Sequence, residues 1–373
     1  MRIAIVGTSL FGQGAEYAMA SLARGLVARG HVVDVIVSHI HRDLVERGRM
    51  PFQLDGRVGL VVLHVRRARW SVPELTFLLA RRRYDAVMSH ANTFVLPLAI
   101  AVRLSCSGAR LIKVEHLGGI GCDSHGNALA TPTGRMNLVW RFVRSSLSAQ
   151  FAVSTGVAEA VARFERYPRE RIYVVYNPVV DDDFHRKLAV EPVLLPDDFR
   201  NRPVVMAAGA FCEIKHYDLL IRAFARIDRS LDARLVIYGD GPCRRQYEDL
   251  IGRLGLQARV LLPGFVNNLP AQLRLAACFV CTSWVESFSI VLVEALAAGV
   301  PVVSTDAPTG PSEILADGAY GRLVPRDDED KLVEAICDVL RGGVQPVPEE
   351  SWRRFSAEAV LDRYENALGE VVK

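Results

Sequence analysis

The sequence has no long apolar run. Its longest uninterrupted apolar stretch, residues 94–102, has nine residues and contains Pro97, whereas a membrane-spanning helix needs about 20. We therefore expect no segment to cross a bilayer. The opening stretch Met1–Gly7 is too short for the apolar core of a signal peptide and leads directly into a glycine-bearing loop, so we expect a cytoplasmic protein.

Cysteine is scarce, and its spacing is irregular. Seven cysteines in 373 residues do not form a disulfide framework, and a reducing compartment keeps them as thiols. Cys278 and Cys281 form a C-x-x-C, but they lie in a strand-like run, where positions three apart point to opposite faces. Residues 181–183 are consecutive aspartates, which we interpret as a solvated turn in a linker. The sequence therefore predicts no metal site and no cofactor.

Lysine is rare, with five residues beside forty arginines, and the small net charge of +3 conceals an asymmetry. Residues 1–180 carry 23 Lys and Arg against 12 Asp and Glu, a net charge of +11. Residues 181–373 carry 22 against 30, a net charge of −8. This asymmetry predicts that only the first half faces an anionic surface or an anionic substrate. We expect no nucleic-acid partner.

Apolar residues make up 50% of the chain, whose length suits about two domains. Short apolar runs alternate with helical patterns on both sides of a polar, proline-bearing stretch at 177–203. The expected strands are residues 2–6, 31–37, 60–65, 86–89, 111–114, 150–153, 172–175, 204–208, 234–238, 260–262, 278–281 and 301–304.

Such alternation predicts an α/β protein with two doubly wound parallel sheets, in domains over 1–180 and 181–351. The amphipathic helix expected over 352–370 is predicted to pack back on the first domain. Ligands bind beside the carboxyl ends of the strands in such folds, so we expect the site in a cleft that both domains face.

A glycine-bearing loop follows the first expected strand. Residues 7–14 place Gly12 and Gly14 at the start of a helical pattern, where backbone amides can approach a phosphate; a tight turn that needs small residues is the alternative. The spacing differs from the dinucleotide fingerprint G-x-G-x-x-G, and Asp34 falls within a strand rather than at its end. The sequence therefore argues against a nicotinamide dehydrogenase.

Glu294 lies in residues 290–298, a helical run that is apolar on every side. A carboxylate buried there needs hydrogen-bond donors, which ribose hydroxyls, an arginine or backbone amides could supply. The loop ahead of this helix supplies a candidate anion site, made of the candidate N-cap Ser287, the amides of Phe288 and Ser289, and Glu286 at its mouth.

Two further polar residues follow expected strands. Lys215 comes after the strand that ends near Gly209. His116 follows the strand over 111–114 and precedes a glycine-rich loop at 117–121, which would let a substrate approach closely. A solvated surface lysine and a structural histidine are the alternative interpretations, and the residues alone leave both open.

In this order, the motifs of the chain resemble those of the retaining nucleotide-sugar glycosyltransferases of family 4, which have the two-domain GT-B fold. The resemblance spans nearly the whole chain. The matching segments are Gly12–Glu16, Gly30–Val35, Val175–Pro178, Lys215 with Asp218–Phe224, Tyr238–Pro242, Leu262–Val266, and Glu286–Glu294 with its continuation to Thr305.

The resemblance implies transfer of a glycosyl group from a nucleoside diphosphate, with retention of the anomeric configuration and without a metal ion. The family has no agreed side-chain nucleophile, and the leaving phosphate is thought to take the acceptor proton. The implied catalytic residues are His116, Glu286 and Lys215. The implied nucleotide-sugar contacts are Gly12, Gly14, Lys215, Gly264, Phe265, Val266, Glu286, Ser287, Phe288, Ser289 and Glu294. Of these, Glu294 would bind the ribose, Lys215 the diphosphate and Glu286 the sugar.

The sequence departs from the family pattern at Ala210, where an arginine is usual, and at Ser287 and Ser289, where glycines are usual. The segment Thr309–Leu315 resembles a variant found in members that build bacterial surface polysaccharides. We therefore expect a UDP-hexose or UDP-N-acetylhexosamine donor and a sugar or lipid-linked glycan acceptor. The alternatives are a sugar-nucleotide epimerase or a phosphorylase of the same fold, and a non-catalytic scaffold subunit that keeps the fold.

Basic clusters in the first domain flank an apolar segment. Arg66–Trp70 and Arg81–Arg83 lie on either side of Leu75–Leu79. Aromatic and aliphatic residues between arginines suit the interface of an anionic bilayer. The pattern predicts peripheral docking on the inner face of the cytoplasmic membrane, and an ordinary amphipathic helix with a solvated basic face is the alternative.

Overall fold

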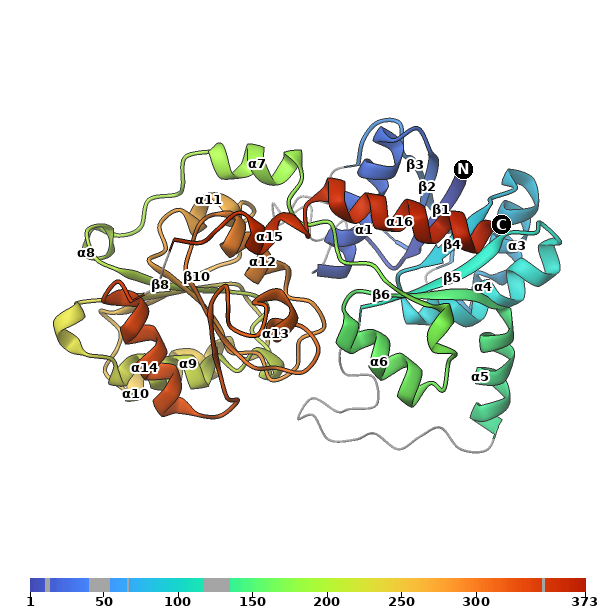
Figure 1. Ribbon diagram of the computed structural model, residues 1–373. Coiled ribbons are helices and arrows are strands. Elements are labelled where there is room, and N and C mark those ends of the chain that lie inside the picture. The colour runs from blue at the N-terminus through green and yellow to red at the C-terminus, as the bar shows by residue number, and fades with distance from the viewer. Residues whose placement is uncertain (11–13, 40–53, 66, 117–134, 344–345) are drawn as a thin grey trace. The chain divides into compact units, whose positions relative to one another are not determined.

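The computed structural model describes residues 1–10, 14–39, 54–65, 67–116, 135–343 and 346–373 (Figure 1). These residues divide into two compact units. The first unit comprises the described residues up to Val179 together with Phe355–Lys373, and the second comprises Val180–Arg354. Each unit is built on one parallel β-sheet with helices on both faces.

In the first unit, the described residues form a seven-stranded sheet in the order β3-β2-β1-β4-β5-β6-β7. The strands are β1 (Arg2–Gly7), β2 (Val32–Val37), β3 (Gly59–Val62), β4 (Ala86–Ser89), β5 (Arg110–Glu115), β6 (Leu147–Ala152) and β7 (Ile172–Val174). The helices are α1 (Gly14–Ala28), α3 (Val72–Arg82), α4 (Asn92–Ser105), α5 (Arg135–Ser146), α6 (Thr155–Phe164) and α16 (Ala357–Val372), with short 3-10 turns η1 (Ala68–Trp70) and η2 (Arg169–Arg171). Every neighbouring pair of strands is parallel.

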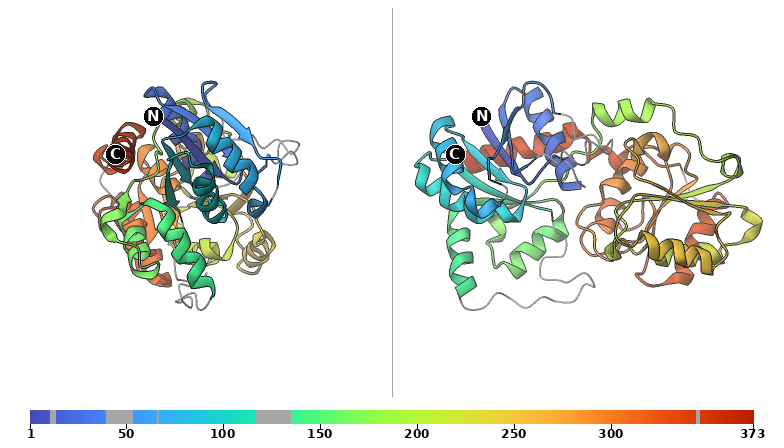
Figure 2. Two further views of the ribbon diagram at one scale, coloured as in Figure 1. Left: turned by 90° about the vertical axis from the view of Figure 1, so that its right-hand side faces the viewer. Right: turned by 180° about the vertical axis from the view of Figure 1, so that it is seen from behind.

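The helix α16 ends the chain, yet it packs beside α1 near the start of the chain (Figures 1 and 2). Gly25 of α1 permits the close approach, because a Cβ at that position would lie 2.5 Å from Leu361 Cδ1. Arg29 then pairs with Asp362 and Glu365, at 2.6 Å each. The layer on the other face of the sheet holds α3, α4 and α5, which pack on one another in that order.

In the second unit, the described residues form a six-stranded parallel sheet in the order β10-β9-β8-β11-β12-β13. The strands are β8 (Val204–Ala208), β9 (Arg234–Tyr238), β10 (Val260–Gly264), β11 (Cys278–Cys281), β12 (Val302–Thr305) and β13 (Arg322–Val324). The helices are α7 (Asp182–Ala189), α8 (Asp197–Arg200), α9 (Tyr217–Arg226), α10 (Arg244–Arg253), α11 (Leu269–Leu273), α12 (Ile290–Ala297), α13 (Pro311–Ile314), α14 (Glu329–Leu340) and α15 (Glu350–Arg353), with 3-10 turns η3 (Glu213–Lys215) and η4 (Arg229–Leu231). Contacts place α9, α10 and α14 on one face and α7, α11, α12 and α15 on the other.

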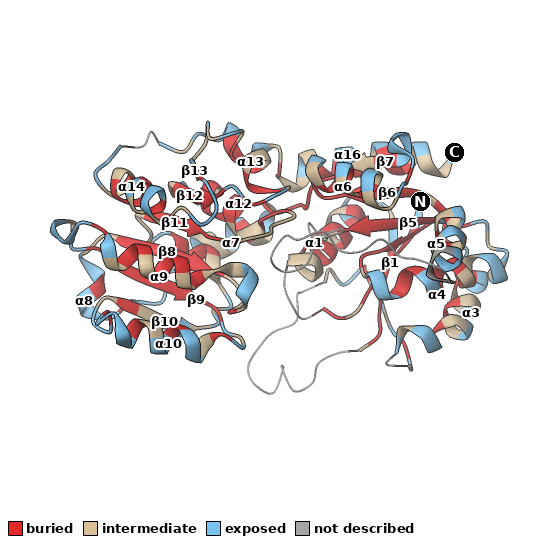
Figure 3. Cartoon of the chain, turned by 90° about the horizontal axis from the view of Figure 1, so that it is seen from below, coloured by how far each residue is buried: buried red, intermediate tan, exposed pale blue. Residues whose placement is uncertain are grey.

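The inner strands of both sheets are largely buried, and exposed residues gather on the outer surfaces of the helices (Figure 3). Every residue of β8, β9, β11 and β12 is buried. Helices on both faces of a parallel sheet exclude water from both sides of each strand. This burial explains why the strands are continuous apolar runs in the sequence.

The α/β fold class with two doubly wound parallel sheets is confirmed, and three local expectations need correction. The helix expected over 352–370 is two helices, α15 in the second unit and α16 in the first. The aspartates at 181–183 start α7 instead of forming a solvated turn, because Asp181 caps the helix and accepts a hydrogen bond from the amide of Phe184 at 2.8 Å. The strand β13 was not expected from the sequence.

No helix in the described part of the chain combines the length and the apolar composition that a membrane span requires.

Candidate functional site

Lys215 is positioned by the turn that follows β8. Its side chain runs beside Gly209, since a Cβ on Gly209 would lie 3.5 Å from Lys215 Cε. The Nζ atom lies 2.6 Å from Glu286 Oε2. Burial by itself lowers the pKa of Lys215, but the negative charge of Glu286 outweighs burial and the pKa lies above its usual value. The structure therefore brings together two residues that the sequence had singled out separately, as a cation paired with an anion.

The loop between β11 and α12 holds Glu286 in place. Ser283 Oγ donates to Glu286 Oε2 at 3.2 Å, and Thr309 Oγ1 donates to the carbonyl oxygen of Glu286 at 2.8 Å. Thr282 Oγ1 donates to the carbonyl oxygen of Lys215 at 2.9 Å. The loops after β8, β11 and β12 thus meet around the ion pair. Sequence analysis did not single out Thr282 and Ser283, although their place directly after β11 was a usable signal.

The start of α12 differs in detail from the expectation. Ser289 is the N-cap, not Ser287, and its side chain makes no capping hydrogen bond. Ser289 Oγ is buried and has no hydrogen-bond partner among the described residues. The first amides of a helix have no partner within the helix. The unpaired hydroxyl and these amides together make a group of donors that suits an anion.

Glu294 lies within α12, with only 8% of its surface exposed. Within the described part of the chain its carboxylate makes no hydrogen bond. Burial raises the pKa of Glu294 to about 7. The positive charge of Lys187 opposes this shift, and the negative charge of Asp181 adds a smaller contribution to it. A buried carboxylate without donors is costly to the fold, so this position suits a ligand that brings its own donors.

The ends of β8, β9 and β10 approach one another through glycines. Gly264 has a φ of +94°, and its carbonyl oxygen accepts a hydrogen bond from the amide of Gly239 at 2.8 Å. A Cβ on Gly239 would lie 1.9 Å from the carbonyl oxygen of Gly209, so only glycine fits there. Phe265 is exposed and Val266 is half-buried. Gly264, Phe265 and Val266, three of the implied nucleotide-sugar contacts, therefore lie together at the end of β10.

Arg244 is a further cation that the sequence analysis missed. It begins α10, and its Nη2 donates to the carbonyl oxygen of Leu262 at 2.9 Å. Its guanidinium carbon lies 5.7 Å from the ring centre of Phe211, the residue that follows Ala210. The Nη1 atom is buried without a partner among the described residues. An arginine therefore lies beside the loop in which the usual family arginine is absent.

In the first unit, His116 is paired with a second histidine. His116 follows β5, and His90 follows the neighbouring strand β4. His90 Nδ1 and His116 Nε2 lie 3.0 Å apart, and the ring centres are 5.0 Å apart. Burial lowers the pKa of His116 to about 4, and burial together with His116 lowers the pKa of His90 well below its usual value. Both rings are therefore neutral near pH 7.

The amino-terminal glycine loop is described in part. Gly14 begins α1, whereas Gly12 lies outside the described residues, as does the glycine-rich segment 117–121. Thr8 Oγ1 donates to Glu16 Oε1 at 3.4 Å, which connects the end of β1 to the first turn of α1.

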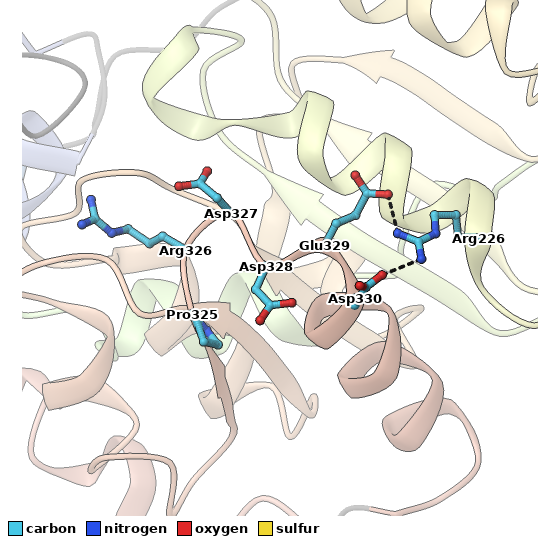
Figure 4. Close-up of a pocket in the computed structure, with 7 residues that line it drawn as sticks. All are labelled: Arg226, Pro325, Arg326, Asp327, Asp328, Glu329 and Asp330. Atoms are coloured by element: carbon cyan, nitrogen blue, oxygen red, sulfur yellow. Dashed lines mark hydrogen bonds and ion pairs between the residues drawn. The ribbon is translucent and has the colours of Figure 1, made fainter.

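The loop between β13 and α14 lines a hollow of about 480 Å³ in the second unit (Figure 4). Its lining residues are Arg226 and residues 325–330. Arg226 is already paired with Glu329 at 2.9 Å and with Asp330 at 2.5 Å. Because four acidic side chains line this hollow against two arginines, it does not suit a nucleotide phosphate.

Among the described residues, no three His, Cys, Asp or Glu side chains come together as a metal site would require. The cysteines of the C-x-x-C are free and buried, and burial raises the pKa of the Cys278 thiol to about 12.

The fold that these two parallel sheets define is GT-B. The crystal structure of Anabaena HepE in complex with UDP and glucose aligns with a TM-score of 0.75, covering 99% of this chain and 100% of that chain at 19% sequence identity. Residues 12–183 match Glycosyltransferase Family 4, and residues 202–342 match Glycosyl transferases group 1. The chain therefore belongs to the family 4 glycosyltransferases, as its motifs had indicated.

Two curated relatives come from Campylobacter jejuni. The first, N-acetylgalactosamine-N,N'-diacetylbacillosaminyl-diphospho-undecaprenol 4-alpha-N-acetylgalactosaminyltransferase, is 33% identical over 182 residues. This match covers 49% of the chain and 47% of the relative, so the chain spans about half of that protein's length. The second, an alpha-1,4-N-acetyl-D-galactosaminyltransferase whose name specifies a PP-undecaprenol-linked glycan, is 25% identical over 353 residues, covering 91% of the chain and 89% of the relative.

Glu294 provides a first test, through the stability of the protein. A raised pKa in the folded state means that stability is lost as the pH rises from the usual glutamate range through about 7. We expect Glu294→Gln to raise the free energy of unfolding by about 3 kcal/mol near pH 8 and to leave it nearly unchanged near pH 4. Urea denaturation at both pH values measures the difference.

The matched control is Glu286→Gln, the same chemical change at a carboxylate that neutralises Lys215. It is expected to lower the free energy of unfolding near pH 8, because it leaves a buried ammonium without its counter-ion. A loss of stability near pH 8 in both variants would contradict the interpretation of Glu294.

Proposed function

We propose that the chain is a retaining glycosyltransferase that moves a hexose or N-acetylhexosamine from a UDP-sugar to a hydroxyl of a sugar or lipid-linked glycan in bacterial glycan biosynthesis. The observation that carries the proposal is the carboxylate of Glu294, which is buried and makes no hydrogen bond within the described part of the chain. Two ribose hydroxyls would supply the missing donors. Family membership and the activities named for the relatives support the same reaction class.

The diphosphate would bind between Lys215 and the start of α12. Lys215 is held in its cationic form by Glu286, and Ser289 Oγ is a buried donor without a partner among the described residues. Phosphate oxygens would accept from both and from the first amides of α12. These donors would stabilise the charge that develops on the leaving phosphate as the sugar departs.

Glu286 would change partners when the donor binds. It now accepts from Lys215 and from Ser283. Phosphate oxygens compete for the ammonium of Lys215, which frees the carboxylate of Glu286 to accept hydrogen bonds from hydroxyls of the donor sugar. The bond from the anomeric carbon to the phosphate oxygen breaks, the bond to the acceptor oxygen forms on the same face, and the leaving phosphate takes the acceptor proton. No step in this proposal requires a metal ion.

Binding of UDP tests the role of Glu294. We expect Glu294→Gln to weaken UDP binding about 10- to 100-fold, because hydrogen bonds to a charged group contribute about 1.5 to 3 kcal/mol. Wild-type affinity should rise between about pH 6 and pH 8 as the carboxylate becomes charged. Isothermal titration calorimetry measures both effects.

The control for UDP binding is Glu334→Gln, which changes an exposed glutamate on α14 of the same unit. It should bind UDP as the wild type does. Equal affinity of the wild type and Glu294→Gln would rule out the ribose assignment.

His116 is expected to act on turnover rather than on donor affinity, because it belongs to the other unit. We expect His116→Ala to lower kcat about 100-fold while the donor KM changes by less than about threefold. Release of UDP from the best donor in a panel of nucleotide sugars measures both constants. A raised donor dissociation constant with unchanged kcat would show that the assignment is wrong.

The first unit offers a surface for a lipid-linked acceptor. Large apolar side chains are exposed on η1, α3, α4 and α5, namely Trp70, Phe77, Leu104 and Leu138, each more than 60% exposed. Exposed arginines lie on the same elements, namely Arg69, Arg81 and Arg141, and Arg67 directly precedes η1. Next to α4 and α5, Arg103, Arg110 and Arg171 line a hollow of about 520 Å³. Apolar side chains among arginines suit an anionic bilayer surface.

Part of the segment that we expected to dock on the membrane is occupied by contacts within the fold. Leu75 and Leu79 face the core, so Phe77 is the large exposed residue of Leu75–Leu79. Arg82 forms an ion pair with Asp34 at 2.7 Å, which ties it to the fold. Arg66 lies outside the described residues. A charge-reversal test must therefore spare Arg82.

Sedimentation with liposomes of anionic lipid at low salt tests the docking surface. We expect the double variant Arg69→Glu with Arg81→Glu to lose most of its binding, since each basic residue near such a surface contributes about 1 kcal/mol. The matched control reverses two exposed arginines on α10 of the second unit, Arg245→Glu with Arg253→Glu. Equal binding of the two double variants would remove this surface from the proposal.

A further inference from the structure

We propose that His90 is a positioning residue for His116, and that it leaves Nδ1 of His116, rather than Nε2, to meet the sugar substrates. The inference rests on the proposed function of His116 in glycosyl transfer. It extends that function by naming the atom that acts and the residue that selects it.

The two histidines are fixed by neighbouring strands. In the parallel register of β4 and β5, Ser89 is level with Lys113, so His90 is level with Val114. His116 lies two residues beyond Val114 and therefore points to the same side of the sheet. The amide of His90 also donates to the carbonyl oxygen of Val6 at 2.8 Å, which anchors its backbone to β1.

The hydrogen bond between the rings uses one nitrogen of each histidine. His90 Nδ1 and His116 Nε2 are 3.0 Å apart. In a neutral imidazole one nitrogen donates and the other accepts. One ring must therefore donate to the other. The direction of this hydrogen bond decides, for each ring, whether the second nitrogen carries a proton or a lone pair.

The burial of His90 decides the direction of this hydrogen bond. His90 is 8% exposed, and its Nε2 is buried with no partner among the described residues. A proton on that atom would be a buried N–H group without an acceptor, which is costly and rare. We therefore place the proton of His90 on Nδ1, from which it is donated to His116 Nε2.

His116 is then left with a proton on Nδ1, an atom that makes no hydrogen bond within the described part of the chain. This N–H can donate to an oxygen of the donor or acceptor sugar. The lone pair on Nε2 is engaged by His90 and is not available as a base. His116 therefore orients a sugar oxygen and does not remove the acceptor proton, in agreement with a reaction in which the leaving phosphate takes that proton.

Three substitutions of His90 test the inference, because asparagine places an amide donor near the position of Nδ1 and aspartate places an acceptor there. We expect His90→Ala to lower kcat about 10- to 100-fold with the donor KM changed by less than about threefold. His90→Asn should keep kcat within about threefold of the wild type, and His90→Asp should be as slow as His90→Ala. Thermal unfolding of each variant shows whether it is folded.

A double variant and a spectrum complete the test. We expect His90→Ala with His116→Ala to be no slower than His116→Ala alone, because His90 acts through His116. Long-range proton–nitrogen correlation spectra of histidine-labelled protein should show His116 with its proton on Nδ1. If His90→Ala does not fold, the isosteric pair His90→Asn and His90→Asp and the spectrum still decide.

Several results would overturn the inference. One is unchanged turnover in His90→Ala when His116→Ala is impaired, and another is equal turnover in His90→Asn and His90→Asp. The others are additive losses of turnover in the double variant and a spectrum that places the proton of His116 on Nε2. Unchanged turnover in His116→Ala would instead overturn the proposed role of His116, and this inference with it.

Discussion

Each inner strand of the two sheets is hydrogen-bonded to a parallel neighbour on both sides and covered by helices on both faces. Such a strand offers one place where a polar side chain can meet a ligand without disturbing the core, namely its carboxyl end. The polar residues of the candidate site obey this constraint. His90 and His116 follow β4 and β5, Lys215 follows β8, and Ser283 follows β11. The apolar interior thus confines these polar side chains to the carboxyl ends of the strands.

The same constraint makes unpaired charge in the interior exceptional. Lys113 in β5 is paired with Glu115 and Glu165, at 2.8 and 2.5 Å. Asp34 in β2 accepts from Tyr84 at 2.7 Å and pairs with Arg82. These charges are structural, because each has a protein partner that offsets the cost of burial. Glu294 is also buried but makes no hydrogen bond in the described part of the chain, and this contrast is why we propose a ligand contact for it.

The sequence predicted most strands because burial on two faces leaves a continuous apolar run. It failed where an element is short or where contacts determine its limits. The strand β13 has three residues and begins with Arg322, so it has no apolar run to detect. The final helical pattern divides at residues 354–356, where the chain passes from one unit to the other. The N-cap of α12 is Ser289. The sequence pointed to Ser287 instead, because two serines two residues apart give the same local signal.

By itself, the sequence determined the α/β class, the positions of most strands and several of the polar residues that follow them, among them Lys215 and His116. These properties depend on patterns within a few residues, which burial and hydrogen bonding impose locally. Only the tertiary structure decided which polar residues meet, and it added His90, which the sequence had not indicated. His90 and His116 are 26 positions apart, and Lys215 and Glu286 are 71 positions apart. Their contacts depend on the order of strands in each sheet, which brings β4 beside β5 and β8 beside β11, and no local pattern encodes that order.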